Sequence, residues 1–109
     1  MTRGEIWTIS GGPDYAAKPR PAIIVQGDRF DATISVSVCP LTTVAVESVH
    51  VRFPIQPTIT NGLRLTSYAM VDKISTVPRA KLGRFIGRVG KRQLTLLNQR
   101  IALFLGLGE

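Results

Sequence analysis

The side chains that could carry chemistry in this 109-residue chain are arginine, threonine and aspartate. Its seven carboxylates are scattered along the sequence and form no closely spaced acidic cluster of the kind that holds magnesium. His50 is the only histidine, so an acid and base pair of two histidines cannot exist, and no histidine and cysteine spacing suits zinc. Neither Gly-x-Gly-x-x-Gly nor the phosphate-loop pattern occurs. We therefore expect no metal and no cofactor.

Arginine and threonine are enough for one reaction, the cleavage of RNA. The 2′-hydroxyl of RNA is a built-in nucleophile, so a protein needs only to align it, assist proton transfer and stabilise charge on the phosphorane-like transition state. Arginine suits the last task because its planar fork meets two phosphate oxygens at once. Cys39 is the only cysteine, and next to Pro40 it is more typical of a small core residue than of a nucleophile.

Five short motifs follow one another along the chain, and their order is more informative than any one of them. They are Arg3-Gly-Glu-Ile-Trp7, Lys18-Pro-Arg-Pro-Ala22, Cys39-Pro-Leu-Thr-Thr43, Tyr68-Ala-Met-Val-Asp-Lys-Ile74 and Leu82-Gly-Arg-Phe-Ile-Gly-Arg-Val89. Together they resemble the MazF/PemK family of toxin endoribonucleases over nearly the whole chain. The resemblance implies a mainly β (α+β) fold, a small SH3-like, CcdB/PemK-type curled antiparallel barrel with a C-terminal helix. It also implies a single domain over residues 1–109.

The resemblance assigns roles to three residues. Arg20 matches the family's catalytic arginine, which assists proton transfer and stabilises the scissile phosphate, and Thr42 matches the catalytic threonine that hydrogen-bonds to it. The products would carry 2′,3′-cyclic phosphate and 5′-hydroxyl ends. Asp72 is a secondary candidate, at the position of an acid that helps to form the site in some relatives. Each has an ordinary alternative: a surface charge for Arg20, a strand-end hydroxyl satisfied by backbone for Thr42, and a surface ion pair for Asp72.

The chain departs from parts of the family at two places. Asp14 and Tyr15 lie in the first loop, where some relatives carry a histidine, and Met70 stands where one branch carries arginine. Further residues expected to contact RNA are Lys18, Thr43, Lys73, Arg79 and Lys81.

Positive charge is concentrated in the last third of the sequence. The chain has 14 lysines and arginines against 7 acidic residues, a formal charge of +7, which favours polyanionic partners. No acidic residue occurs between Asp72 and Glu109, whereas eight basic residues do. The members of this cationic block are Lys73, Arg79, Lys81, Arg84, Arg88, Lys91, Arg92 and Arg100. We expect the cationic block to supply affinity for RNA or for an acidic inhibitor, separately from cleavage at Arg20 and Thr42.

Hydrophobic patterning predicts short strands followed by one helix. The strand patterns cover residues 4–10, 21–26, 34–41, 50–55, 65–74 and 84–89, with a turn at 78–83. Leu94, Leu97, Ile101 and Leu105 recur at three- and four-residue spacing, which predicts an amphipathic helix that ends before Gly106. The N-terminus lacks the apolar run of a signal peptide and no stretch is long enough to span a bilayer, so we expect a cytoplasmic protein without a membrane role.

The leading hypothesis is a toxin of a type II toxin-antitoxin system: a metal-independent, sequence-specific endoribonuclease that cleaves single-stranded RNA. The resemblance further implies a homodimer and an acidic antitoxin protein that silences it. One alternative is a gyrase-poisoning, CcdB-like toxin on the same fold, although that group ends in Trp-Gly-Ile and this chain ends in Leu107-Gly-Glu109. A second alternative is a non-catalytic RNA-binding module in which Arg20 only holds phosphate.

Overall fold

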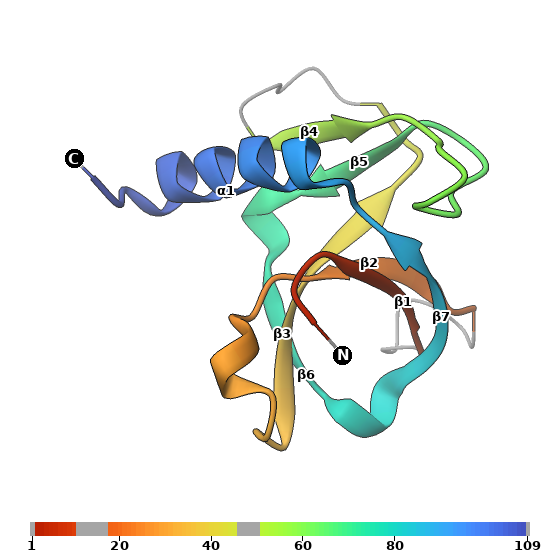
Figure 1. Cartoon of the computed structure of the whole chain (residues 1–109), viewed down its shortest axis with the longest axis vertical. Coiled ribbons are helices and arrows are strands. Elements are labelled where there is room, and N and C mark those ends of the chain that lie inside the picture. The colour runs from red at the N-terminus through yellow and green to blue at the C-terminus, as the bar shows by residue number, and fades with distance from the viewer. Residues whose placement is uncertain (1, 11–17, 46–50, 109) are drawn as a thin grey trace.

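The computed structural model describes residues 2–10, 18–45 and 51–108. Within this part of the chain, one antiparallel sheet is accompanied by a single C-terminal α-helix (Figure 1). The strands are β1 (Glu5–Ile9), β2 (Arg20–Ile24), β3 (Ser35–Thr42), β4 (Arg52–Ile55), β5 (Ser67–Met70), β6 (Ser75–Pro78) and β7 (Leu82–Arg88). Short 3-10 turns are η2 (Asp28–Phe30), η3 (Val71–Lys73) and η4 (Arg79–Lys81), and the helix is α1 (Lys91–Leu105).

The strand order is β4-β5-β3-β2-β1-β7, and β6 pairs with the first half of β3. This arrangement confirms the predicted antiparallel sheet with a C-terminal helix. The strands curl around one another in Figure 1, but no pairing among the described strands closes them into a complete barrel. No helix in this described part is long and apolar enough to cross a membrane.

Strand β3 lies at the centre of the sheet and contains a proline, Pro40. Its Ser37 carbonyl accepts a hydrogen bond from the Val25 amide on the β2 side, at 3.1 Å. Because backbone groups alternate sides along an antiparallel strand, Pro40 presents its missing N–H toward β5 and β6 instead. The ladder is interrupted at that point, since β5 pairs with Leu41 and Thr42 and β6 pairs with residues 35–38. Proline is tolerated at position 40 because neither β5 nor β6 pairs with this residue, so no hydrogen bond from its nitrogen is needed on that side.

The same interruption corrects the prediction of one strand over residues 65–74. The two β3 residues Cys39 and Pro40 face residues 70–74 of the partner, which accommodate the extra length as the 3-10 turn η3. The prediction missed this break because it depends on Pro40, a residue far away in the sequence. The strand predicted at 50–55 is seen as β4 from Arg52, and His50 lies outside the described residues.

Two hydrophobic clusters lie on opposite faces of β3. Cys39 and Leu41 belong to the larger cluster, while Val36 and Val38 belong to the smaller one. The larger cluster contains Ile6, Ile23, Cys39, Leu41, Phe53, Ile55, Ala69, Val71, Val89 and Leu97. The smaller cluster contains Ala22, Ile24, Val36 and Val38, with Trp7, Ile9, Val77 and Leu82 packed against it. Both faces of β3 are thus covered. Ile34, the first residue of the predicted strand, precedes β3 and is exposed.

The C-terminal helix is confirmed, with three of the four residues of its predicted apolar stripe packed on the sheet, whereas Leu105 is exposed. Leu97 is fully buried in the larger cluster, and Leu94 and Ile101 pack against it. Gly106 adopts a left-handed conformation at φ 74°, and the Leu107 amide donates to the Ala102 carbonyl at 2.9 Å. This is the Schellman arrangement that glycine favours just past a helix end.

The two glycines of the run 82–89 lie where other parts of the chain come close. A Cβ on Gly87 would overlap the backbone of Asn61, and a Cβ on Gly83 would overlap the Thr8 hydroxyl. Asn61 is buried and binds three other parts of its own loop: its side-chain oxygen accepts from the amides of Thr58 and Leu63, and its nitrogen donates to the Gln56 carbonyl. The motif therefore lets β7 pass tightly beneath the 56–63 loop.

Candidate functional site

Two of the predicted residues lie at the same end of the sheet. Arg20 is the first residue of β2 and Thr42 is the last residue of β3. The two strands are antiparallel and pair Ala22 with Pro40, so the same register extended by two residues places Arg20 opposite Thr42. Flanking prolines favour an extended backbone at Arg20, which fixes where the strand begins.

A small hollow of about 80 Å³ joins these residues, and it is lined by Arg20, Pro21, Leu41, Thr42, Thr43 and Ser67. It thus brings together both expected catalytic residues and Thr43. Ser67 was missed in the sequence, where it lies in a predicted strand without any motif. The pairing of β5 with the end of β3 carries Ser67 to the hollow, and its hydroxyl donates to the Leu65 carbonyl at 3.1 Å.

The Thr42 hydroxyl has a fixed orientation. Its oxygen accepts a hydrogen bond from the Val44 amide at 3.1 Å, a local turn that threonine commonly forms. An amide donor occupies a lone pair and leaves the hydroxyl proton available to donate. Thr42 is therefore placed to donate a hydrogen bond to an acceptor in the small hollow.

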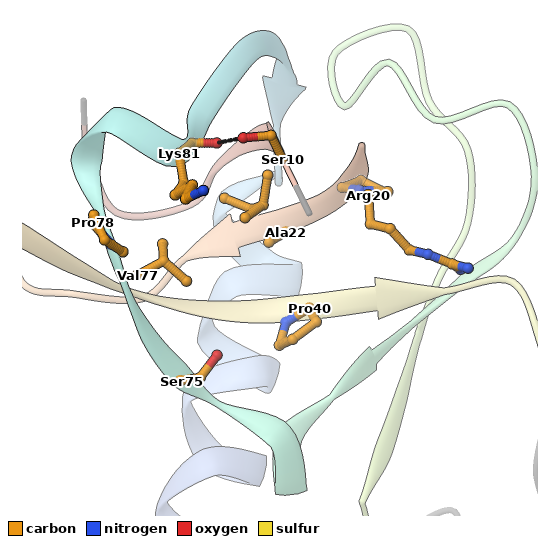
Figure 2. Close-up of a pocket in the computed structure, with 10 residues that line it drawn as sticks. Ser10, Arg20, Ala22, Pro40, Ser75, Val77, Pro78 and Lys81 are labelled. Atoms are coloured by element: carbon orange, nitrogen blue, oxygen red, sulfur yellow. Dashed lines mark hydrogen bonds between the residues drawn. The ribbon is translucent and has the colours of Figure 1, made fainter. Parts of the chain in front are cut away.

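A second, larger hollow of about 260 Å³ adjoins the first, and Arg20 and Pro21 line both. Its other lining residues are Ile9, Ser10, Ala22, Pro40, Ser75, Val77, Pro78 and Lys81. Figure 2 shows Lys81 and Ser10 at one end and Arg20 at the other, with the Arg20 side chain extending away from Lys81. The Ser10 hydroxyl donates to the Lys81 carbonyl at 3.3 Å and joins the end of β1 to η4. Lys81 is thus the member of the cationic block that shares a hollow with Arg20.

The remaining predicted residues line neither hollow. Asp72 forms an ion pair with Arg52 from η3 to β4, and exposed Lys73 follows it. Arg79 donates its Nε proton to the Thr33 carbonyl. Lys18 is exposed ahead of β2 and lines neither hollow.

The electrostatics of the two hollows favour an anion. Neither contains a carboxylate among its described lining residues, whereas the larger one holds both Arg20 and Lys81. In residues 2–10, 18–45 and 51–108, no three side chains of His, Cys, Asp and Glu gather as a metal site would require. Cys39 is buried, and burial raises its pKa to about 12, so its thiol remains protonated near neutral pH.

The motif at residues 3–7 is structural in this fold. The Glu5 carboxylate is 9% exposed and accepts hydrogen bonds from the Trp7 indole at 2.9 Å and the Thr2 hydroxyl at 3.0 Å. Arg88 of β7 binds the same carboxylate at 2.9 Å. Burial alone raises the pKa of Glu5, but the hydrogen bonds from Trp7 and Thr2 outweigh it and hold the pKa below 4.5. The buried carboxylate therefore links β1 to β7.

Comparison with known proteins identifies the family. Residues 2–105 match the family model described as PemK-like, MazF-like toxin of type II toxin-antitoxin system. The chain belongs to this family. It is 41% identical over 107 residues to the probable endoribonuclease MazF of Mycolicibacterium smegmatis, with 98% of both chains covered. It is 31% identical over 119 residues to endoribonuclease MazF9 of Mycobacterium tuberculosis, again with 98% of both covered.

Solved structures agree with this assignment. One is an endoribonuclease in complex with its cognate antitoxin from a mycobacterial species, with a TM-score of 0.83 and 25% identity over 100% of this chain and 98% of that one. Another is the Mycobacterium tuberculosis toxin MazF-mt6, with a TM-score of 0.80 and 27% identity over 96% and 99%. The predicted family is thus confirmed, and the protein is a homologue of MazF endoribonucleases.

Proposed function

We propose that this MazF homologue cleaves single-stranded RNA at the small hollow, without a metal ion, to give 2′,3′-cyclic phosphate and 5′-hydroxyl ends. The observation that carries the proposal is that Arg20 and Thr42, from different strands, line one hollow that contains no carboxylate among its described residues. A scissile phosphate placed there meets a guanidinium fork and a hydroxyl donor. Asp72 has no direct part in this step, because its carboxylate is paired with Arg52.

The reaction needs one bond to form and one to break. The 2′-oxygen attacks the adjacent phosphorus and loses its proton, while the bond from phosphorus to the 5′-oxygen breaks and that oxygen gains a proton. Arg20 stabilises the charge that develops on the non-bridging oxygens and assists proton transfer, and Thr42 donates a hydrogen bond to the same phosphate. Fixed donors of this kind contribute in the transition state because they need no reorganisation.

The test is incubation of the purified protein with mixed-sequence single-stranded RNA in EDTA, followed by analysis of the product ends. We expect cutting in EDTA, and a loss of about 100-fold or more in Arg20→Ala and Thr42→Val. Thr42→Ser keeps the hydroxyl and should retain most of the activity. Arg29→Ala, which removes an exposed cation in η2, is the matched control.

Three outcomes would contradict the proposal: a strict need for magnesium, full activity in both Arg20→Ala and Thr42→Val, or RNA binding without any cutting. The last result would favour a non-catalytic RNA-binding module instead.

We further propose that the protein acts as a homodimer and is silenced by an acidic antitoxin. Large apolar side chains are exposed at the end of α1 and just after it, with Leu103 at 59% and Leu107 at 65% exposure. Partner proteins commonly cover surfaces of this kind. The net charge of +7 favours an acidic ligand. Light scattering coupled to size exclusion should give the mass of a dimer for the protein, and a smaller mass for Leu103→Glu.

A further inference from the structure

The larger hollow has a composition unlike that of a phosphate site. Six of its ten lining residues are apolar: Ile9, Pro21, Ala22, Pro40, Val77 and Pro78. Its three prolines carry no backbone N–H, so these parts of the wall offer no donor to a phosphate oxygen. Ala22 belongs to the smaller hydrophobic cluster, and Ile9 and Val77 pack on that cluster, so the lining is held by core packing. Such a surface suits a flat, apolar ligand group.

Cationic side chains lie at both ends of this hollow. Lys81 stands at one end and Arg20 at the other, as Figure 2 shows. A nucleotide in a chain has the same pattern, an apolar base face between two flanking phosphates. The hydroxyls of Ser10 and Ser75 add polar groups at the edge that can meet the donors and acceptors of a base.

We propose that the larger hollow is a subsite for one nucleobase of the RNA, adjacent to the cleaved phosphate. This inference rests on the proposed function, because it takes the scissile phosphate to lie at Arg20. The small hollow has a volume of about 80 Å³, which suits part of a phosphate group. The larger hollow has a volume of about 260 Å³, which suits a base. Arg20 lines both, so a phosphate at its guanidinium directs the neighbouring base across Pro21 and Pro40. The subsite contributes to the choice of sequence that is cut.

The test is a substitution at an exposed position that fills the larger hollow with a bulky side chain. Ser75 lies on β6 and faces the hollow, while Thr76, next to it, is exposed, points to the other face of the strand and lines neither hollow. Ser75→Tyr should therefore prevent the base from binding in the larger hollow. Thr76→Tyr is the matched control, because it adds the same aromatic side chain to the same strand outside the hollow. Cleavage ends on a randomised RNA are mapped by sequencing for both variants.

We expect Ser75→Tyr to weaken base preference at one position beside the cleaved bond and to lower kcat/KM for the preferred sequence by about 5- to 100-fold, the usual worth of one base contact. Thr76→Tyr should match the unaltered protein. The decisive substrate is an oligonucleotide that is abasic at the affected position, which Ser75→Tyr and the unaltered protein should cut at equal rates. Ser10→Tyr fills the hollow from the β1 side and repeats the test if Ser75→Tyr does not fold.

Failure of the subsite and failure of the proposed function give different results. If the unaltered protein makes no cyclic-phosphate ends, the proposed function fails. If it does make them while both Ser75→Tyr and Ser10→Tyr keep full base preference and rate, only the subsite is overturned. In that case an apolar side chain of a peptide ligand becomes the better occupant of the hollow.

Discussion

Glu5→Gln tests whether the buried carboxylate holds β1 against β7. Glutamine keeps the shape and one acceptor oxygen, so the bond from Trp7 survives as a weaker, neutral one. The position of the other oxygen becomes an NH₂ group, which no longer accepts from the Thr2 hydroxyl and faces Arg88 donor to donor. The Arg88 guanidinium is thereby displaced. Replacing the charged acceptor of the Trp7 hydrogen bond by a neutral one costs about 1 kcal/mol. The Arg88 side chain is 48% exposed, so solvent screening limits the loss of its ion pair to about 1 kcal/mol. We expect a total near 2 kcal/mol, or a Tm lower by about 8 °C.

The stability difference between Glu5→Gln and the unaltered protein should depend on pH. The Glu5 pKa is lowered in the folded protein, so its stabilising effect is present above the ordinary value of 4.5 and is lost as the pH falls through the lowered pKa. Thermal unfolding from pH 7 to pH 3 should therefore show a gap between the two proteins that closes at acid pH. Arg88→Ala should cost about 1 kcal/mol and serves as the comparison. A gap that stays constant over this range, or a variant as stable as the parent at pH 7, would refute the reasoning.

Four other predictions concern particular residues. Asn61→Ala removes three hydrogen bonds inside the 56–63 loop and should cost about 3 kcal/mol in chemical denaturation; a cost below 0.5 kcal/mol would contradict the role given to it. Gly87→Ala forces a Cβ into the backbone of that loop and should cost about 3 kcal/mol by the same assay, and a neutral effect would mean that the loop moves freely. Cys39 should not react with a thiol reagent at pH 8 until the protein unfolds, since it is buried with a pKa of about 12, and rapid native labelling would disprove this. Lys81→Met should lower the slope of log affinity against log salt for single-stranded RNA by about 0.7, whereas an unchanged slope would remove Lys81 from the RNA path.

Local patterns predicted the parts of the fold that depend on neighbours in sequence. The helix was predicted from leucine spacing and from Gly106, and both signals operate within a few residues. The β2 strand was predicted from an apolar run bounded by Pro and Gly, and the β3 strand from alternation of apolar and polar residues. Both predictions lie within two residues of the observed ends. Arg20 and Thr42 were selected by their motifs, and the sheet register now explains why those motifs belong together.

The parts that escaped prediction depend on contacts between distant segments. The break between β5 and β6 follows from Pro40 on the facing strand, and no local signal marks it. Ser67 joins the site only because β5 pairs with the end of β3. The cationic block is predicted to supply affinity for RNA or for an acidic inhibitor, and its sequence gives no sign that two of its members also bind their own protein. Arg79 binds Thr33 and Arg88 binds Glu5.

In the proposed reaction, Arg20 and Thr42 act on a phosphate that is attacked by the neighbouring 2′-hydroxyl. The most direct measurement uses one preferred oligonucleotide in EDTA with a single 2′-deoxy nucleotide on the 5′ side of the cleaved bond. We expect the all-RNA strand to be cut to a 2′,3′-cyclic phosphate and the 2′-deoxy strand to remain uncut. Cleavage of the 2′-deoxy strand at the same bond would contradict the proposed reaction, because the nucleophile would then have to come from elsewhere.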